Sequence, residues 1–264
     1  MQDIMTASII VSAAGLLFGA LLGIVSKIFA VEHDEKFPLI LEVLPGANCG
    51  GCGFAGCSQF ASAVISGEAN TGGCPVGGAD TARGISKIMG VFMDSFEKKV
   101  AFIRCAGSEG IAEVKYSYEG NMDCYSASKI AGGQKACQYS CLGYGTCLSV
   151  CRFGAISIKS NLAVIDFEKC TGCGQCVNAC PKNVISIISK KDKYIVKCQN
   201  KDKANVLKFK CSTGCIGCKL CEKSCPVSAV KVDNFLATID KELCISCGQC
   251  AEKCPRKIIR KVTV

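Results

Sequence analysis

The pattern of apolar and polar residues divides the chain into a long apolar start and a larger part built from short elements. Residues 4–26 form a stretch of 23 residues without a charged side chain. A helix of that length, rising about 1.5 Å per residue, reaches across a hydrocarbon core roughly 30 Å thick. We therefore predict a single transmembrane helix within an anchor at residues 1–30. A buried helix of a soluble protein is the alternative. A cleaved signal peptide fits less well, because no Lys or Arg precedes the stretch.

The predicted anchor carries Gly15, Gly19 and Gly23 at four-residue spacing on one helical face. Small residues at this spacing let two membrane helices approach closely, so we expect a partner helix. A helix that is simply rich in glycine is the alternative. Lys27 flanks the C-terminal end of the stretch, and most Lys and Arg residues follow it. Because positive residues favour the cytoplasmic side, we predict a single-pass protein of the cell membrane with its large domain in the cytoplasm.

Beyond the anchor, apolar spacing predicts short helices at residues 58–66 and 81–96 and short strands at 100–105 and 113–118. Later in the chain, each of four cysteine runs is followed by residues that alternate between apolar and polar. Alternation bounded by turn residues is typical of half-buried antiparallel strands. We predict one strand pair after each run, at residues 155–167, 184–198, 229–240 and 257–264.

The composition changes this picture through its 24 cysteines. The four runs follow or approach C-x2-C-x2-C-x3-C, and three of them end in Cys-Pro, at Cys180-Pro181, Cys225-Pro226 and Cys254-Pro255. Bacterial ferredoxins use this spacing to hold pairs of 4Fe-4S clusters, and the fourth cysteine of each run binds the other cluster of the pair. Disulfides and zinc are the alternatives. Disulfide frameworks, however, scatter their cysteines among loops, and zinc sites pair two C-x2-C units.

The crossing rule predicts two ligand sets in each of two ferredoxin-like modules. In the first module they are Cys137, Cys141, Cys147, Cys180 and Cys151, Cys170, Cys173, Cys176. In the second they are Cys215, Cys218, Cys221, Cys254 and Cys225, Cys244, Cys247, Cys250. The run from Cys137 departs from the pattern, with gaps of three, five and three residues and Arg152 in place of proline.

A glycine-rich segment near the anchor predicts a fifth cluster, because glycine lets the backbone wrap closely around a cubane. Its ligands would be Cys49, Cys52, Cys57 and Cys74. Four cysteines then remain, namely Cys105, Cys124, Cys198 and Cys211. Four is the number that one cubane needs, so we consider a sixth cluster between the modules. Buried thiols, which behave as small apolar side chains, are the alternative.

These assignments predict an α+β multidomain protein. The predicted parts are a transmembrane anchor (1–30), a small α-rich 4Fe-4S domain (31–95), a connecting segment (96–133) and two tandem ferredoxin-like modules (134–197 and 198–264).

The formal net charge of +9 is misleading for such a protein. Coordinating thiols are deprotonated, so each oxidised cluster with its four thiolates carries about −2, and five clusters bring the total to about −1. The charge therefore gives little support for nucleic-acid binding. Residues 181–264 nevertheless hold 18 Lys and Arg against 7 Asp and Glu. This surplus predicts a docking face for an acidic electron carrier, and simple solubility is the alternative.

The apolar anchor, the motif LPGANCGGCGFAGC at residues 44–57 and the run KACQYSCLGYGTCLSVCRFGAI at residues 135–156 together resemble the B subunit of the Rnf complex, an ion-translocating ferredoxin:NAD oxidoreductase. The resemblance covers essentially the whole chain, and the second module is similar to that of the long clostridial form. It implies an electron-relay subunit that accepts electrons from reduced ferredoxin and passes them to transmembrane and flavin-carrying subunits. It also implies that the assembled complex moves Na+ or H+.

The residues agree with such a division of labour. No G-x-G-x-x-G motif follows a predicted strand, no P-loop occurs, and no acid–base constellation is visible, so we expect neither flavin nor NAD nor bond-making catalysis on this chain. A relay subunit of a non-pumping membrane enzyme, or of a complex that reduces a redox-sensing transcription factor, is the competing function. A structural zinc or disulfide protein at the membrane is a third.

Overall fold

The computed structural model describes all residues except 1, 29–33, 94–95 and 263–264. Its helices are α1 (Gln2–Ile28), α2 (Lys36–Val43), α3 (Cys57–Ile65), α4 (Gly78–Met89), α5 (Cys124–Lys129), α6 (Thr146–Ser149), α7 (Gln175–Asn178), α8 (Ala204–Leu207), α9 (Leu220–Lys223) and α10 (Gln249–Glu252). Its strands are β1 (Lys99–Ile103), β2 (Ile156–Lys159), β3 (Leu162–Ile165), β4 (Ile185–Ser189), β5 (Tyr194–Val196), β6 (Val230–Asp233), β7 (Leu236–Ile239) and β8 (Ile259–Lys261).

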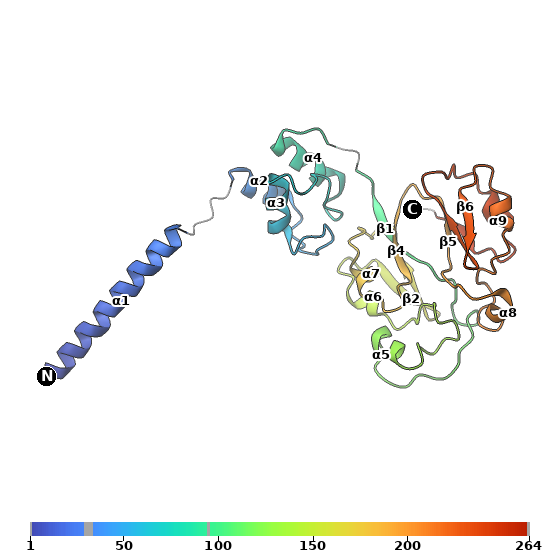
Figure 1. The fold of residues 1–264 in the computed structure, drawn as a ribbon, viewed down its shortest axis with the longest axis horizontal. Helices are drawn as coiled ribbons and strands as arrows, with labels where there is room; N and C mark the ends of the chain where they lie inside the picture. Colours follow the sequence, from blue (N-terminus) through green and yellow to red (C-terminus); the bar gives the residue numbers. More distant parts are fainter. Residues whose placement is uncertain (1, 29–33, 94–95, 263–264) are drawn as a thin grey trace.

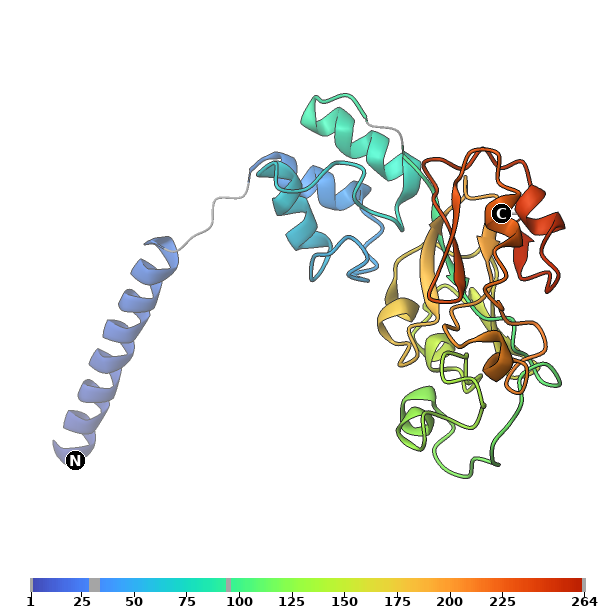
Figure 2. The same cartoon turned by 45° about the vertical axis from the view of Figure 1, so that its right-hand side comes forward.

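Helix α1 covers the apolar stretch and stands apart from the rest of the chain (Figures 1 and 2). The side chains described along it, those of residues 12–25, are all exposed, and Leu16 is 77% exposed. A helix over residues 4–26 is thus confirmed. Within the part of the chain that the structure describes, no helix meets the length and apolar character required of a membrane span.

A small helical domain follows, built from α2, α3 and α4 (Figure 1). Its core is formed by Ile40 of α2, Phe60 of α3 and Ile85 of α4, all at most 1% exposed. The hydroxyl of Thr81 donates to the carbonyl of Val43 at 3.2 Å and ties α4 to the end of α2. The helix predicted at 81–96 begins earlier and ends at Met89, where Gly90 adopts a left-handed conformation that terminates helices.

The rest of the chain folds into two small modules, each with two antiparallel strand pairs. The pairs β2–β3 and β6–β7 are the hairpins predicted after the first and third cysteine runs. The pairs predicted at 184–198 and 257–264 are wrong. Strand β4 pairs with β1, so that Ile103 faces Ile185, and β5 pairs with β8, so that Val196 faces Ile259. Alternation identifies a strand but not its partner, which depends on how the chain returns.

This pairing gives the two modules the same plan. An outer strand leads in (β1 or β5), a hairpin follows (β2–β3 or β6–β7), and a last strand returns to the first (β4 or β8). Each module has its own buried core, and the two lie side by side in both views (Figures 1 and 2). Strand β5, expected in the first module, therefore belongs to the second.

The segment between β1 and the first cysteine run has little regular structure. The strand predicted at 113–118 is wrong, because Val114 takes part only in an isolated bridge to Lys135. A neighbouring bridge joins Ala112 to Cys211 of the second module. The expected domain limits near residues 30 and 95 fall at 29–33 and 94–95, outside the described residues.

Candidate iron–sulfur centres

All 24 cysteines lie in the described part of the chain and are free thiols. Among the described residues, no three or more His, Cys, Asp or Glu side chains are arranged to hold a metal ion. The question is therefore which thiols the fold gathers in fours, since a cubane spreads its iron atoms over four thiolates.

In the helical domain, Cys49 and Cys52 lie on the loop before α3, Cys57 is the first residue of α3, and Cys74 lies in the turn before α4. Burial raises the pKa of Cys74, and the thiols of Cys52 and Cys49 raise it further, while the N–H of Gly77 donates to its sulfur at 3.3 Å. Cys52 and Cys57 pack against the same core as Cys74. The fold thus brings the predicted set together at one end of the domain.

In the second module, one cavity is lined by Cys215, Cys218, Cys221 and Cys254, the first predicted set. Burial raises the pKa of Cys221 to about 11, helped by the thiols of Cys215 and Cys254. The second predicted set also gathers. Burial raises the pKa of Cys250, and the thiols of Cys244, Cys225 and Cys247 act in the same direction.

In the first module, a matching cavity is lined by Cys151, Cys170, Cys173 and Cys176, again a predicted set. Burial raises the pKa of Cys176 to about 12, and the thiols of Cys170, Cys173 and Cys151 contribute. The N–H of Ala101 on β1 donates to the sulfur of Cys170 at 3.3 Å. The outer strand, which the sequence did not place in this module, thereby supports its cluster loop.

The remaining two groups differ from the predicted ones. Burial raises the pKa of Cys147 to about 12, and the neighbouring thiols that raise it further are, in order, Cys141, Cys124, Cys180 and, from the adjacent group, Cys176. Cys124 begins α5, and its backbone N–H donates to the Thr146 hydroxyl at 2.7 Å, next to Cys147. Cys124 therefore lies with Cys141, Cys147 and Cys180, where the sequence analysis placed Cys137.

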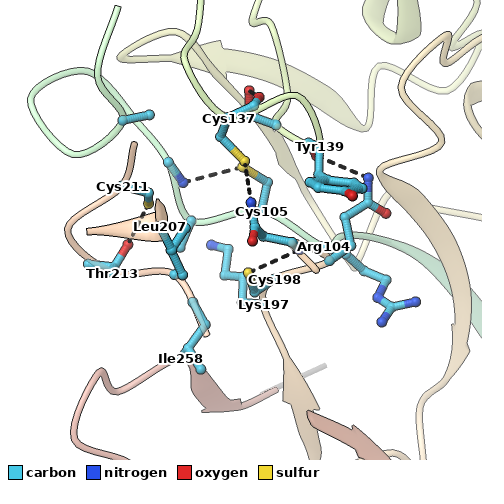
Figure 3. A pocket seen from close by; sticks show the side chains of 17 residues that line it. Arg104, Cys105, Cys137, Tyr139, Lys197, Cys198, Leu207, Cys211, Thr213 and Ile258 are labelled. Atoms are coloured by element: carbon cyan, nitrogen blue, oxygen red, sulfur yellow. Dashed lines mark hydrogen bonds between the residues drawn. The ribbon is translucent and has the colours of Figure 1, made fainter. Parts of the chain in front are cut away.

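Cys137 lies instead with the three other leftover cysteines. One cavity is lined by Cys105, Cys137, Cys198 and Cys211, which come from four separate segments and surround it (Figure 3). All four side chains are buried. Burial raises the pKa of Cys137, and the Cys105 and Cys211 thiols raise it further. Two of these cysteines belong to each module, so the cavity lies on the boundary between them.

The exchange of Cys124 and Cys137 has a simple explanation in the duplication of the module. The segment Cys141–Cys151 has the same length as Cys215–Cys225, and Tyr144 stands where the second module has Cys218. Gly143 and Gly217 also correspond. Both have a positive φ, and both lie against the hairpin of their own module. The first run is thus not stretched. It is a regular run with one cysteine replaced, and Cys137 corresponds to Cys211.

This correspondence was available in the sequence. Counting backwards from Cys151 with gaps of three, two and two residues reaches Cys147, Tyr144 and Cys141. What the sequence could not show is that Cys124, far before Tyr144 in the chain, folds back beside that position. The ring of Tyr144 packs on Tyr118 with centroids 5.3 Å apart, and Cys124 packs against the same small cluster.

The polar groups around the shared cavity fit thiolate ligands better than inert thiols. The N–H of Gly107 donates to Cys105 at 3.3 Å, and the N–H groups of Asn200 and Cys215 donate to Cys198 at 3.4 Å. The Asn200 amide also donates to the Cys137 sulfur at 3.2 Å. Asn200 is 1% exposed, and Asp202 holds its side chain in place. Hydrogen bonds to the sulfurs are a means by which proteins tune iron–sulfur clusters.

The helical domain and the first module meet at their cysteine loops. The Gln175 amide donates to the Cys49 carbonyl, and the Arg152 guanidinium donates to the Ala47 carbonyl at 2.9 Å. A Cβ on Gly51 would lie only 2.8 Å from the Cys173 carbonyl oxygen, so glycine is needed for this approach. Two predicted ligand loops therefore touch directly.

Exposure separates the second module from the others. Cys218 and Cys247 are the two exposed cysteines of the 24. Exposed apolar side chains lie beside them in the chain, Leu220 next to the first and Leu243 and Ile245 next to the second. Lys219 and Lys223, at the two ends of α9, and Lys253, directly after α10, are also exposed. We call these eight residues the module 2 face.

Comparison with known proteins finds iron–sulfur family models at three places in the chain. A family model described as "Putative Fe-S cluster" matches residues 44–76, a "4Fe-4S binding domain" matches 163–186, and a "4Fe-4S dicluster domain" matches 214–259. The first covers the helical domain's ligand loop. The last covers both predicted ligand sets of the second module.

Whole-chain relatives are also found, and all three named here are B subunits. The chain is 45% identical over 251 residues to that of the Na(+)-translocating ferredoxin:NAD(+) oxidoreductase complex of Acetobacterium woodii, covering 95% of this chain and 75% of that one. It is 41% identical to that of the ion-translocating oxidoreductase complex of Methanosarcina acetivorans, covering 98% and 99% of the two chains. It is 42% identical to that of the proton-translocating ferredoxin:NAD(+) oxidoreductase complex of Clostridium ljungdahlii, covering 99% and 94%. The chain belongs to the family of B subunits of ion-translocating oxidoreductase complexes.

Proposed function

We propose that this chain is the electron-relay subunit of a membrane-bound, ion-translocating ferredoxin:NAD oxidoreductase complex. The proposal is carried by three cavities, each lined by four cysteines, and by the neighbouring thiols from which three further groups of four are inferred. When bound, a 4Fe-4S cluster supplies one-electron transfer at a potential set by its surroundings. The chain's own residues hold the clusters, bring their loops into contact and tune them through N–H donors to sulfur.

The proposed ligand sets correct two of those expected from the sequence. Four sets are unchanged, namely Cys49, Cys52, Cys57, Cys74; Cys151, Cys170, Cys173, Cys176; Cys215, Cys218, Cys221, Cys254; and Cys225, Cys244, Cys247, Cys250. The corrected sets are Cys124, Cys141, Cys147, Cys180 and, shared between the modules, Cys105, Cys137, Cys198, Cys211.

Electrons from reduced ferredoxin would arrive at the module 2 face, because its cysteines are exposed and its lysines suit an acidic carrier. The shared group joins this module to the first. The contact between Gly51 and Cys173 then joins the first module to the helical domain, which is followed back along the chain by α1. The proposed direction thus runs from the C-terminal module towards the membrane.

We also propose that α1 anchors the chain in the cell membrane, with the cysteine domains on the cytoplasmic side and with transmembrane, flavin-carrying subunits as partners. The support is the exposed apolar side chains described along it, among them Leu16, Leu17 and Phe18, which no other described part of the chain covers. Chain that leaves the membrane fraction in an alkaline carbonate wash would contradict this anchoring.

The ligand sets are tested by removing the Cys124 thiol and placing a cysteine at position 144 instead. Cys124→Ser should remove one cluster, lowering the iron content from about 24 to about 20 atoms per chain, since a cubane with three thiolates is labile. Adding Tyr144→Cys restores the regular spacing of the second module, so the double variant should regain about 24 atoms. Iron and inorganic sulfide are measured on anaerobically purified chain.

Tyr139→Cys in the Cys124→Ser background is the matched control, because Tyr139 lines the shared cavity rather than the Cys124 group. It should not restore iron. Wild-type protein with about 20 iron atoms would contradict the six-cluster proposal. Full iron in the Cys124→Ser variant would contradict the corrected set.

A further inference from the structure

Lys135 is a buried lysine whose charge no carboxylate balances. Lys135 is only 2% exposed, and none of the ion pairs among the described residues includes it. Its ammonium donates to the carbonyl oxygens of Gly107 and Asn161, each at 2.7 Å. Burying a charge is costly unless it is hydrogen-bonded and balanced by nearby opposite charge. The position of Lys135 therefore needs an anionic neighbour.

The neighbours that fit are cysteine sulfurs from two different groups. The Lys135 ammonium interacts electrostatically with the sulfurs of both Cys105 and Cys141. Cys105 belongs to the shared group, whereas Cys141 belongs to the group completed by Cys124.

The two carbonyls that hold the ammonium also belong to these two sites. Gly107, which accepts one of its hydrogen bonds, donates its own N–H to the Cys105 sulfur at 3.3 Å. Asn161, which accepts the other, lies against Gly143, two residues after Cys141. Lys135 therefore ties the backbone beside one group to the backbone beside the other.

We propose that Lys135 is a positioning residue that raises the reduction potentials of the two adjacent clusters, the shared one and the one held by Cys141. This deepens the proposed function and rests on it. Reducing a cluster adds one negative charge, and a cation at short range in a poorly polarisable interior stabilises that charge. Electrons arriving from the second module would thus be drawn across the boundary between the modules.

The duplication shows that this charge is not required by the fold. The residue at the corresponding position, two before Cys211, is Phe209, which is 70% exposed. The second module therefore builds the same loop without a lysine there. A buried lysine at this position is therefore particular to the first module.

The experiment is an anaerobic redox titration of the full-length protein, followed by EPR, comparing wild type with Lys135→Gln. Glutamine keeps an N–H donor for the carbonyls and removes the charge. Two of the cluster signals should become harder to reduce, with the ratio of oxidised to reduced cluster at a given potential rising at least tenfold, which is about 59 mV for a one-electron couple. Lys231→Gln is the matched control. Lys231 is exposed on β6, where water screens its charge, and no signal should move.

Unchanged potentials in a Lys135→Gln protein that keeps all its iron would overturn the proposal. If that variant loses iron, Lys135→Arg decides, because it keeps the charge. If the Lys135→Arg variant keeps all its iron and has potentials near those of the wild type, the positive charge is what is required. If it also loses iron, only the shape of lysine matters, and the proposal is overturned. The iron content of the wild type separately tests the ligand sets, so the two proposals fail in different ways.

Discussion

The two ferredoxin-like modules have the same arrangement of strands but differ at one ligand position. The difference distinguishes the module proposed to receive electrons from the one proposed to pass them on. In the second module this position is Cys218, which is exposed beside an apolar and basic surface. In the first it is Tyr144, and the proposed ligand is instead Cys124 of α5, which packs against the same small cluster as Tyr144 and Tyr118. The proposed exchange takes one ligand from a distant segment, while the strand plan of the two modules stays the same.

The comparison also explains the long segment between β1 and the first run. In both modules a strand ends two residues before a cysteine, at Ile103 before Cys105 and at Val196 before Cys198. In the second module α8 lies between that cysteine and the next. In the first, the longer insertion carries α5 and Cys124. The insertion is thus the element that closes the first module, while the second module keeps an open face.

The largest effects, on iron content, should come from the shared group, to which the two modules contribute the corresponding residues Cys137 and Cys211. Cys137→Ser and Cys211→Ser should each remove the same cluster, so each single variant and the double variant should all retain about 20 iron atoms per chain. Cys137→Ser combined with Cys141→Ser should retain only about 16, because these residues serve different clusters. Iron analysis of the four proteins is sufficient.

The outcome separates the two groupings directly. With the sets expected from the sequence, Cys137 and Cys141 share a cluster, so that double variant would lose no more iron than either single one. That result would restore the original assignment and remove the equivalence between Cys137 and Cys211.

The next largest effect, on the free energy of unfolding, should come from substitutions at the glycines where each cysteine run lies close to the hairpin of its own module. At Gly143 φ is +83°, and a Cβ would lie 2.4 Å from the Asn161 carbonyl oxygen. Gly143→Ala should therefore cost about 3 kcal/mol or more of unfolding free energy, from strain and overpacking together. Gly217→Ala should behave similarly in the second module, where the Cβ would lie 2.8 Å from the Cα of Phe235.

Gly154→Ala is the control, because Gly154 has a positive φ of +59° but open space around its Cβ position. It should cost only about 1 kcal/mol, the strain of a left-handed residue. Denaturant unfolding of the iron-loaded proteins measures all three. Equal losses at Gly143 and Gly154 would show that contact with the hairpin contributes nothing.

The smallest effect, on the rate of electron transfer from reduced ferredoxin, should distinguish the surfaces of the two modules. Replacing Lys219, Lys223 and Lys253 together by Gln should slow electron transfer from reduced ferredoxin severalfold at low ionic strength and have little effect at high salt, because complementary charge acts mainly on the encounter rate. The matched control replaces three exposed lysines of the first module's part of the chain, Lys129, Lys159 and Lys169.

Stopped-flow mixing with reduced ferredoxin provides the rates. Equal slowing by both triple variants would show that overall charge matters rather than the module 2 face. Rates from ferredoxin that do not depend on ionic strength would remove the electrostatic basis for docking at this face.

The sequence by itself determined the chemistry and most of the grouping. Local spacing places Cys170, Cys173 and Cys176 at one site whatever the rest of the chain does, because a two-residue gap turns successive thiols toward one point. The family resemblance, the helix over residues 4–26 and the hairpins β2–β3 and β6–β7 followed from equally local signals, namely apolar runs and alternation.

Tertiary structure alone decided what depends on contacts between distant segments. The pairing of β1 with β4, the meeting of Cys105, Cys137, Cys198 and Cys211, and the return of Cys124 to the place of Tyr144 all join residues that lie far apart in the chain. Spacing constrains only neighbours in sequence. Which isolated cysteine completes which group depends on how the two modules pack and on the course of the insertion between them.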